Sequence, residues 1–429
     1  MKTKNSNEGI AKVIRGTYLT LLPQTSDAIQ KLQGLADKAT MLTKVIRARE
    51  YCLETQSAHR LAGNAYKLAN EFPSFKELPW HVKSMLAITA SNHAVQSFKP
   101  SSPARFRSIY LYPYCFTLEQ NGERFKRRTS DNHYYTDMGR FVSHADLQSD
   151  ASLTLKLRAP LTFVVPLKEN NQRIAKLRQL ANEGEVSNEP ILSWKDGKLK
   201  LYVSVSRRPK LPSIKQLYEA KDRLAFIGVD LNSIHGIAVA HVSMSHTIEW
   251  SQVFKIDNPL LSKDYTDRIA NLMRCGNRAI AGQMISKAAH SVRVQHYDIA
   301  RQIVDKATEL KSEGLTPVIA IERLDYHSLV KSLGNIRSKR VRKAIASTVL
   351  SALDRLERMA LWHDIRVWKV SPWGTSKQCF RGHNAIAWEG NEYEKRCPKC
   401  GRLAHRHINA SANIAWRAWK VIKRVAQSL

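Results

Sequence analysis

The chain has 429 residues, 43% of them hydrophobic, which is enough for several domains with sizeable cores. Lys and Arg number 68 against 37 Asp and Glu, so the formal net charge is +31 at pH 7. An excess of this size repels itself unless a polyanion neutralises it, and it favours a nucleic-acid partner. The sequence has no run of about 18 apolar residues and no basic start followed by an apolar segment, so we expect a cytoplasmic protein with no membrane partner.

The first half of the chain alternates between strand and helix patterns. Residues 12–23 are rich in β-branched side chains and end at a proline, which predicts a strand, whereas residues 25–96 have a helical pattern. Two later alternating runs meet at Asp196 and Gly197, which predicts a β-hairpin. We therefore expect a β-barrel or sheet domain that is interrupted by helices.

The second half has the pattern of an α/β domain. A cationic segment with two prolines predicts a linker in front of it. Apolar runs then predict buried strands, separated by long helical stretches, and an amphipathic helix closes the chain. The predicted strands are at 224–231, 236–244, 317–324 and 365–370.

Two acidic residues lie at the ends of predicted buried strands. Asp230 ends the first strand of the α/β half, and Glu322 ends the third. An ionised carboxylate there is costly unless a metal or a cation compensates it. Phosphodiester hydrolysis by two Mg²⁺ ions needs three or four acidic ligands, so these two acids indicate the start of such a site. Taken singly, each acid is more typical of a salt-bridged strand end.

A cluster of soft ligands near the C-terminus predicts a zinc site. Cys379 with His383 forms one pair of ligands, and Cys397 with Cys400 forms another. The loop between the pairs is long enough for them to face one another across a tetrahedral ion. Four protein ligands leave no open position, so this zinc would be structural; the alternative is reduced cysteines without a metal. The predicted ligands are Cys379, His383, Cys397 and Cys400.

Five motifs in the chain resemble the transposon-encoded TnpB proteins and the compact type V CRISPR effectors. They are IGVDL, IAIERL, VSPWGTSKQC, CPKCG and RHINASANIA, in this order. The resemblance implies a prokaryotic, mixed α/β and β multidomain protein, with a guide-binding wedge barrel, a helical recognition insert and an RNase H-like RuvC domain that contains a zinc ribbon. The implied boundaries are 1–23 with 105–206 for the wedge, 24–104 for the recognition insert, 207–222 for a linker, 223–378 with 401–429 for the RuvC-like domain, and 379–400 for the ribbon.

The last of these motifs departs from the family pattern DRDxNAA. The chain has HRHINAS instead, so His405 and His407 stand where acids are expected, and His407 takes the place of the third catalytic Asp. No Asp or Glu follows Glu394. Mg²⁺ prefers oxygen ligands, and a neutral imidazole supplies no negative charge. The resemblance therefore implies that Asp230, Glu322 and His407 form an impaired site that holds Mg²⁺ weakly, and it leaves open whether the protein is an enzyme.

Basic segments on each part of the chain fit contacts with phosphates. We predict a protein that uses a guide RNA to bind a DNA duplex beside a short flanking motif, and that silences the target through an R-loop without cleavage. The alternatives are a weak RNA-guided endonuclease and a transposase- or resolvase-like protein that acts without RNA. A second copy of the chain or a large structured RNA would complete the channel that holds the heteroduplex of guide RNA and target DNA. The candidate nucleic-acid-binding residues are Arg124, Lys126, Arg127, Arg128, Arg207, Arg208, Lys210, Arg337, Lys339, Arg340, Arg342 and Lys343.

Overall fold

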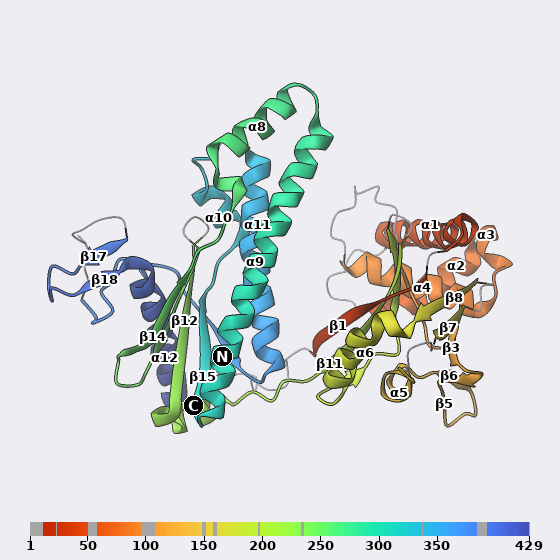
Figure 1. Ribbon diagram of the computed structural model, residues 1–429, viewed down its shortest axis with the longest axis horizontal. Coiled ribbons are helices and arrows are strands. Elements are labelled where there is room, and N and C mark those ends of the chain that lie inside the picture. Colours follow the sequence, from red (N-terminus) through yellow and green to blue (C-terminus); the bar gives the residue numbers. More distant parts are fainter. Residues whose placement is uncertain are drawn as a thin grey trace. The chain divides into compact units, whose positions relative to one another are not determined.

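The computed structural model describes residues 12–22, 24–49, 58–96, 108–147, 152–157, 161–195, 198–232, 236–336, 338–383 and 393–428 (Figure 1). The described residues form two compact units, one within Ile14–Arg208 and the other within Pro209–Leu429. The fold is mixed α/β and multidomain, as the sequence predicts. Over the described residues, no helix is both long and apolar enough to cross a membrane.

The N-terminal unit contains two main sheets and a short ribbon. The first sheet has the order β1-β11-β10-β2, with β9 paired to β11, and the second has the order β4-β3-β7-β8. Strands β5 and β6 pair with each other. The bounds are β1 Val13–Thr20, β2 Ser108–Tyr110, β3 Phe116–Gln120, β4 Glu123–Arg124, β5 Lys126–Arg128, β6 Tyr134–Thr136, β7 Ser152–Leu157, β8 Leu161–Pro166, β9 Glu185–Val186, β10 Ile191–Lys195 and β11 Lys198–Arg207.

The described strands do not close into the predicted β-barrel. A barrel needs a continuous ladder of hydrogen bonds around its circumference, and here the strands divide between two open sheets. The Leu22 N–H donates to the Val164 carbonyl and links the end of β1 to β8. The predicted hairpin is present, because β10 pairs antiparallel with β11 up to Lys195 and Lys198. Its turn, Asp196–Gly197, lies outside the described residues.

Helices surround these sheets. Helix α6 is fastened to β1 by the buried Asn170, whose side chain both donates to the Thr20 carbonyl and accepts from the Thr20 N–H. Such a pairing satisfies a buried amide that would otherwise be costly. The helices of this unit are α1 Ser26–Arg49, α2 Ala58–Glu71, α3 Pro73–Lys76, α4 Trp80–Gln96, α5 Met138–His144 and α6 Leu167–Ala181.

The C-terminal unit is built on one five-stranded sheet of order β14-β13-β12-β15-β16. The first three strands in sequence are antiparallel neighbours, and β15 and β16 then run parallel to β12. The zinc-ligand region adds a two-stranded ribbon of β17 and β18. The bounds are β12 Leu224–Asn232, β13 Gly236–Val242, β14 Ile248–Phe254, β15 Thr316–Glu322, β16 Arg366–Val370, β17 Glu394–Arg396 and β18 Leu403–His405.

Helices cover both faces of this sheet (Figure 1). Alternate strand residues such as Ile227 and Ile319 meet α9 and α11 on one face, whereas Phe226 and Val318 meet α12 on the other. Strands buried on both faces explain the continuous apolar runs in the sequence. The helices are α7 Ile214–Glu219, α8 Lys263–Arg274, α9 Arg278–Ser312, α10 Tyr326–Ser332, α11 Lys339–Trp362 and α12 Arg406–Gln427, with 3₁₀ turns η2 Lys221–Arg223 and η3 Pro259–Leu261.

The segment predicted as a linker, 207–222, is partly folded. Ser213 and Gln216 form a reciprocal capping box that begins α7. Leu217 on this helix is buried among residues of α12 and β12. Helix α7 is therefore packed on the C-terminal unit through Leu217, so this part of the segment does not act as a flexible spacer.

Candidate functional site

Asp230 and Glu322 lie at the carboxyl ends of adjacent parallel strands. Their preceding residues, Val229 and Ile321, are partners in the register of β12 and β15. Because side chains alternate between the faces of a sheet, both carboxylates follow Phe226 and Ala320 onto the face that α12 covers. The predicted pairing of these two acids is therefore built into the strand register.

A glycine allows α12 to approach this face closely. A Cβ atom placed on Gly228 would lie 1.8 Å from the backbone oxygen of Ser411 and 2.8 Å from the backbone nitrogen of Ala415. His407 lies one helical turn before Ser411, and Asp230 lies two residues after Gly228. One helical turn and two strand residues span similar distances, about 6 Å. The contact at Gly228 thereby places His407 beside Asp230.

His407 and Asp230 form a buried polar pair. The Nδ1 atom of His407 lies 2.9 Å from Oδ2 of Asp230, and the two side chains are 6% and 13% exposed. An ionised carboxylate can only accept, so in the neutral imidazole the Nδ1 atom carries the proton and Nε2 has the lone pair. A direct hydrogen bond therefore joins α12 to the end of β12 at this pair.

Glu322 lies in the same region with a strongly shifted acidity. Burial, together with the nearby charge of Asp230, raises the pKa of its carboxyl from 4.5 to about 7. A hydrogen bond from the Thr375 hydroxyl, at 2.7 Å, and the Arg417 guanidinium partly oppose this shift. A buried carboxyl with a raised pKa is one whose ionised form a nearby cation would stabilise.

One face of α12 holds the loop that supplies Thr375. The side-chain amide of Asn413 donates to the carbonyls of Thr375 and Gln378, and Asn409 also donates to Gln378. The Arg417 guanidinium donates to the carbonyls of Ser371 and Trp373. Sequence reasoning did not single out these residues, although two asparagines four residues apart on an apolar helix were a usable signal.

His405 and Arg323 are close in sequence to the residues of this site. His405 ends β18 directly before α12, with its ring centroid 5.7 Å from that of His407. Burial and the neighbouring His407 lower the pKa of His405. Arg323 is exposed, and its backbone N–H donates to the Val370 carbonyl.

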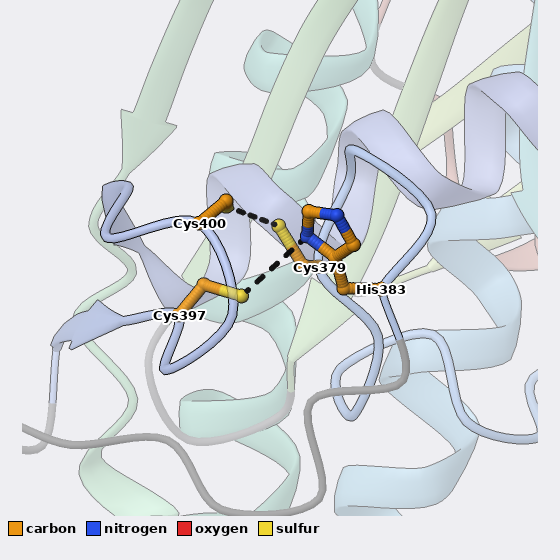
Figure 2. Close-up of side chains that lie close together, drawn as sticks. All are labelled: Cys379, His383, Cys397 and Cys400. Carbon is orange, nitrogen blue, oxygen red and sulfur yellow. Dashed lines mark hydrogen bonds between the residues drawn. The ribbon is translucent and has the colours of Figure 1, made fainter.

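The four predicted zinc ligands converge in one cluster (Figure 2). All their ligand atoms lie within 4.8 Å of one another. The Cys379 and Cys400 sulfurs are 3.8 Å apart, and the Cys397 sulfur is 3.8 Å from His383 Nδ1. A tetrahedral ion with Zn–S bonds of about 2.3 Å requires an edge of about 3.8 Å between sulfurs. The Cys₃His cluster could therefore hold zinc, and His383 completes it.

Tight backbone turns shape both halves of the cluster. Gly382 and Gly401 adopt φ values of +87° and +68°, a region that favours glycine. Burial raises the pKa of the Cys379 thiol to about 11. Burial also acts to raise the pKa of Cys397, but backbone amides of Lys399 and Cys400 donate to its sulfur and lower the pKa to about 6. These amides stabilise a thiolate, which is the form that binds metal.

The predicted nucleic-acid-binding residues of the N-terminal unit are mostly exposed. Arg124 and Lys126, Arg127 and Arg128 occupy β4 and β5, and all four are exposed. Lys126 Nζ lies 4.4 Å from the ring centroid of Tyr134 on the paired strand β6. Arg207 instead forms an ion pair with Glu183 at 3.5 Å and is 15% exposed, whereas Arg208 is exposed.

Those of the C-terminal unit are more varied. Lys210, Lys339, Arg340 and Lys343 are exposed, and the Arg340 guanidinium lies over Gly282 of α9. The Nε atom of Arg342 is buried and has no hydrogen-bond partner among the described residues. Arg337 lies outside the described residues.

Comparison with known proteins gives a match in the region of these sites. Residues 352–414 match the family Cas12f1-like, TNB domain, a span that runs from α11 through the cysteine cluster into α12. This match confirms the resemblance to the compact type V CRISPR effectors. The comparison with curated proteins finds no match.

Solved structures of that effector class are also similar to the chain. One is Cas12f1 with sgRNA and target DNA, at 13% identity over 94% of this chain and 99% of that chain, with a TM-score of 0.32. The mini-RNA-guided endonuclease CRISPR-Cas_phi3 has 11% identity over 95% and 92%, with a TM-score of 0.49. CasPhi-2 (Cas12j) bound to crRNA has 8% identity over 97% and 99%, with a TM-score of 0.47.

Proposed function

We propose that this protein is an RNA-guided DNA-binding protein that holds its target in an R-loop without cutting it. The observation that carries the proposal is the buried pair of His407 and Asp230. A metal-dependent nuclease site needs an oxygen ligand in the place of His407. Here an imidazole fills that place and hydrogen-bonds Asp230 instead of adding a third negative charge.

The C-terminal unit supports assignment as a RuvC-like domain of RNase H fold. Three antiparallel strands are followed by two strands parallel to the first, and acids end the first and the fourth. We assign residues 223–378 and 401–429 to this domain and residues 379–400 to a zinc ribbon. Zinc would stabilise the ribbon and take no part in the reaction, because four protein ligands leave no open position.

The N-terminal unit supports a role in holding the guide and the target. We assign residues 1–23 and 105–206 to a wedge domain and residues 24–104 to a recognition segment. The +31 charge of the whole chain fits a protein that lies along two strands of nucleic acid. Solved relatives are complexes with guide RNA and with target DNA, which fits the same assignment.

A second candidate function is a conditional RNA-guided endonuclease. It is favoured by the way in which Asp230 orients the His407 ring, since metal-binding histidines are commonly oriented by a carboxylate on the other nitrogen. Asp230, Glu322 and His407 would then hold one divalent ion, which would supply Lewis-acid chemistry when bound. Mn²⁺ accepts imidazole more readily than Mg²⁺ does.

Binding and cutting of a guide-matched duplex separate these functions. The RNA that copurifies with the protein is sequenced, a matching target is made, and binding and cleavage are measured with Mg²⁺ and with Mn²⁺. We expect binding that requires the RNA and leaves both strands intact, and Asp230→Ala should bind equally well. Cutting by the unmutated protein that Asp230→Ala abolishes would establish the endonuclease. Equal binding after removal of the RNA would instead refute the guided function.

A further inference from the structure

Helices α9 and α11 pack through two separate apolar clusters, with a polar break between them. Ile285 and Ile345 belong to the cluster near one end of the pair, and Ile303 and Leu356 belong to the cluster on the sheet. His296 lies on α9 in the interval between these clusters. It is 5% exposed, and its hydrogen bond goes to the backbone of Thr348 on α11.

A pocket of about 230 Å³ opens at this break. It is smaller than sites for drug-sized ligands, which are about 300–1,000 Å³, and it suits one small polar group. No acidic residue is among its lining residues in the described part of the chain. The side chains that matter are His290, Arg293, His296 and Tyr297 of α9, with Ser351 and Arg355 of α11.

Arg355 is held in place by an aromatic ring. Its guanidinium carbon lies 4.6 Å from the ring centroid of Tyr297, which is a cation–π distance. A guanidinium that is already positioned loses less freedom when it binds a phosphate, and its planar group of donors matches phosphate oxygens. Arg293 is exposed on the facing helix, so cations stand on both sides of the opening.

We propose that the pocket between α9 and α11 binds a backbone phosphate of nucleic acid, with Arg293 and Arg355 as its two main contacts. This proposal rests on the proposed function, because the pocket would be a surface by which the C-terminal unit holds a guide or target strand. Phosphate groups of RNA and of DNA are chemically equivalent at such a site. The strand is therefore identified by experiment rather than by the pocket.

The neighbouring groups are consistent with an anion. His290 is exposed at the rim and is able to add a donor, while the Ser351 hydroxyl adds another. Asp354, beside Arg355 in sequence, forms an ion pair with Arg358 one turn along α11. The Nδ1 atom of the buried His296 has no hydrogen-bond partner among the described residues. The pocket is therefore lined by a buried polar atom that a bound group could pair with.

The test removes both cations and measures the salt dependence of binding. Full-length Arg293→Gln/Arg355→Gln protein is compared with Lys423→Gln/Arg424→Gln, which removes two charges from the exposed end of α12. The probes are a 20-nucleotide RNA, the same sequence as single-stranded DNA, and duplex DNA, each followed by fluorescence anisotropy. Loss of one phosphate contact lowers the salt slope by about 0.7–0.9, so the slope of at least one probe should fall by about this amount relative to the control.

A conservative variant and the charge-matched control separate a phosphate contact of Arg355 from a general loss of charge. Arg355→Lys keeps the charge but loses the planar stacking, so it should lie between the wild type and the double variant. A double variant that matches the Lys423/Arg424 control with every probe would overturn the proposal. These assays use no guide-matched target. Phosphate binding by the pocket would therefore still be detected if the proposed RNA-guided function were wrong. The probe with the largest loss identifies the strand.

Discussion

The Nδ1 atom of His407 lies 2.9 Å from Oδ2 of Asp230, where both side chains are nearly closed to solvent. In the proposed RuvC-like domain, His407 stands where a third carboxylate would meet Asp230. One oxygen of Asp230 accepts a hydrogen bond from this ring. Replacement of His407 by an acid would exchange that hydrogen bond for a third negative charge.

His407→Asp should restore divalent-metal binding. Three carboxylates close together repel one another, and a divalent ion relieves that repulsion. Mg²⁺ should therefore raise the melting temperature of the variant more than that of the wild type. Target cutting should also appear, because a missing ligand costs roughly 10³-fold or more in rate. His133→Asp is the control, since it adds the same charge at an exposed position of the N-terminal unit. An equal response of both variants to Mg²⁺ would contradict this prediction.

Gly228→Ala should destabilise the C-terminal unit. The added methyl group would meet the Ser411 backbone at 1.8 Å, so α12 must move away from the sheet. Overpacking of this kind costs about 1–3 kcal/mol or more. Denaturant unfolding measures the loss. A Cβ atom on Gly34, at an exposed position of α1, has no neighbour within 4 Å, so Gly34→Ala should be neutral or slightly stabilising. Equal stability of the two variants would rule out the close approach of α12.

Glu322→Gln should change how stability depends on pH. The pKa of Glu322 is raised in the folded protein, from 4.5 to about 7, so its contribution is full below pH 4.5 and is lost as pH rises to about 7. The wild type should lose about 3 kcal/mol across this window that the Gln variant keeps. Unfolding free energies are measured without added Mg²⁺ or Mn²⁺. Glu313→Gln, at an exposed position, should follow the wild type.

His296→Leu should remove a pH dependence of the opposite sign. Burial lowers the pKa of His296 from 6.5 to about 4, so the neutral ring stabilises the fold above pH 6.5. This contribution falls by about 3 kcal/mol as pH drops from 6.5 to about 4. Stability curves of the Leu variant should be flatter in that range, whereas the exposed His327→Leu should behave as the wild type. A wild-type slope in His296→Leu would show that the ring is not the titrating group.

Removal of zinc should unfold part of the C-terminal unit. Purified protein should contain about one Zn²⁺ per chain by metal analysis. Cys397→Ser should lose it and become more sensitive to proteolysis near residues 379–405, because zinc binding contributes directly to folding. Cys275→Ser changes an exposed cysteine far from the cluster in sequence and should keep its zinc. Zinc-free wild-type protein with full stability would indicate reduced cysteines only.

The sequence predicts best where one local rule decides the outcome. Asp230 and Glu322 each end an apolar strand, and parallel pairing then places them together. The spacing of the cysteines and His383 predicts one ligand set, and the four ligand atoms do lie together.

Tertiary relationships limited the remaining predictions. Alternating residues indicate that one face of a strand is buried, but they do not say which strands pair, so the barrel was expected where two open sheets occur. The prolines and cations of residues 207–222 predicted a linker, and the sequence did not indicate that Leu217 is buried, because its burial depends on contact with α12. The roles of Gly228 and Arg417 arise only when that helix lies on the sheet.

The loop that α12 holds has Thr375 near its middle and Cys379 close behind it. Thr375 donates to Glu322, and Cys379 is a ligand of the cysteine cluster, with three residues between them. Asn413 donates hydrogen bonds to the carbonyls of Thr375 and Gln378 and so restrains this short segment. A displacement of Thr375 is therefore transmitted to Cys379, and the reverse. Any coupling through this segment is reciprocal, so a change that orders the cysteine cluster orders the Glu322 carboxylate by the same free energy. Substitution of Glu322 should therefore alter the metal affinity of the cysteine cluster, whether or not the domain cuts DNA.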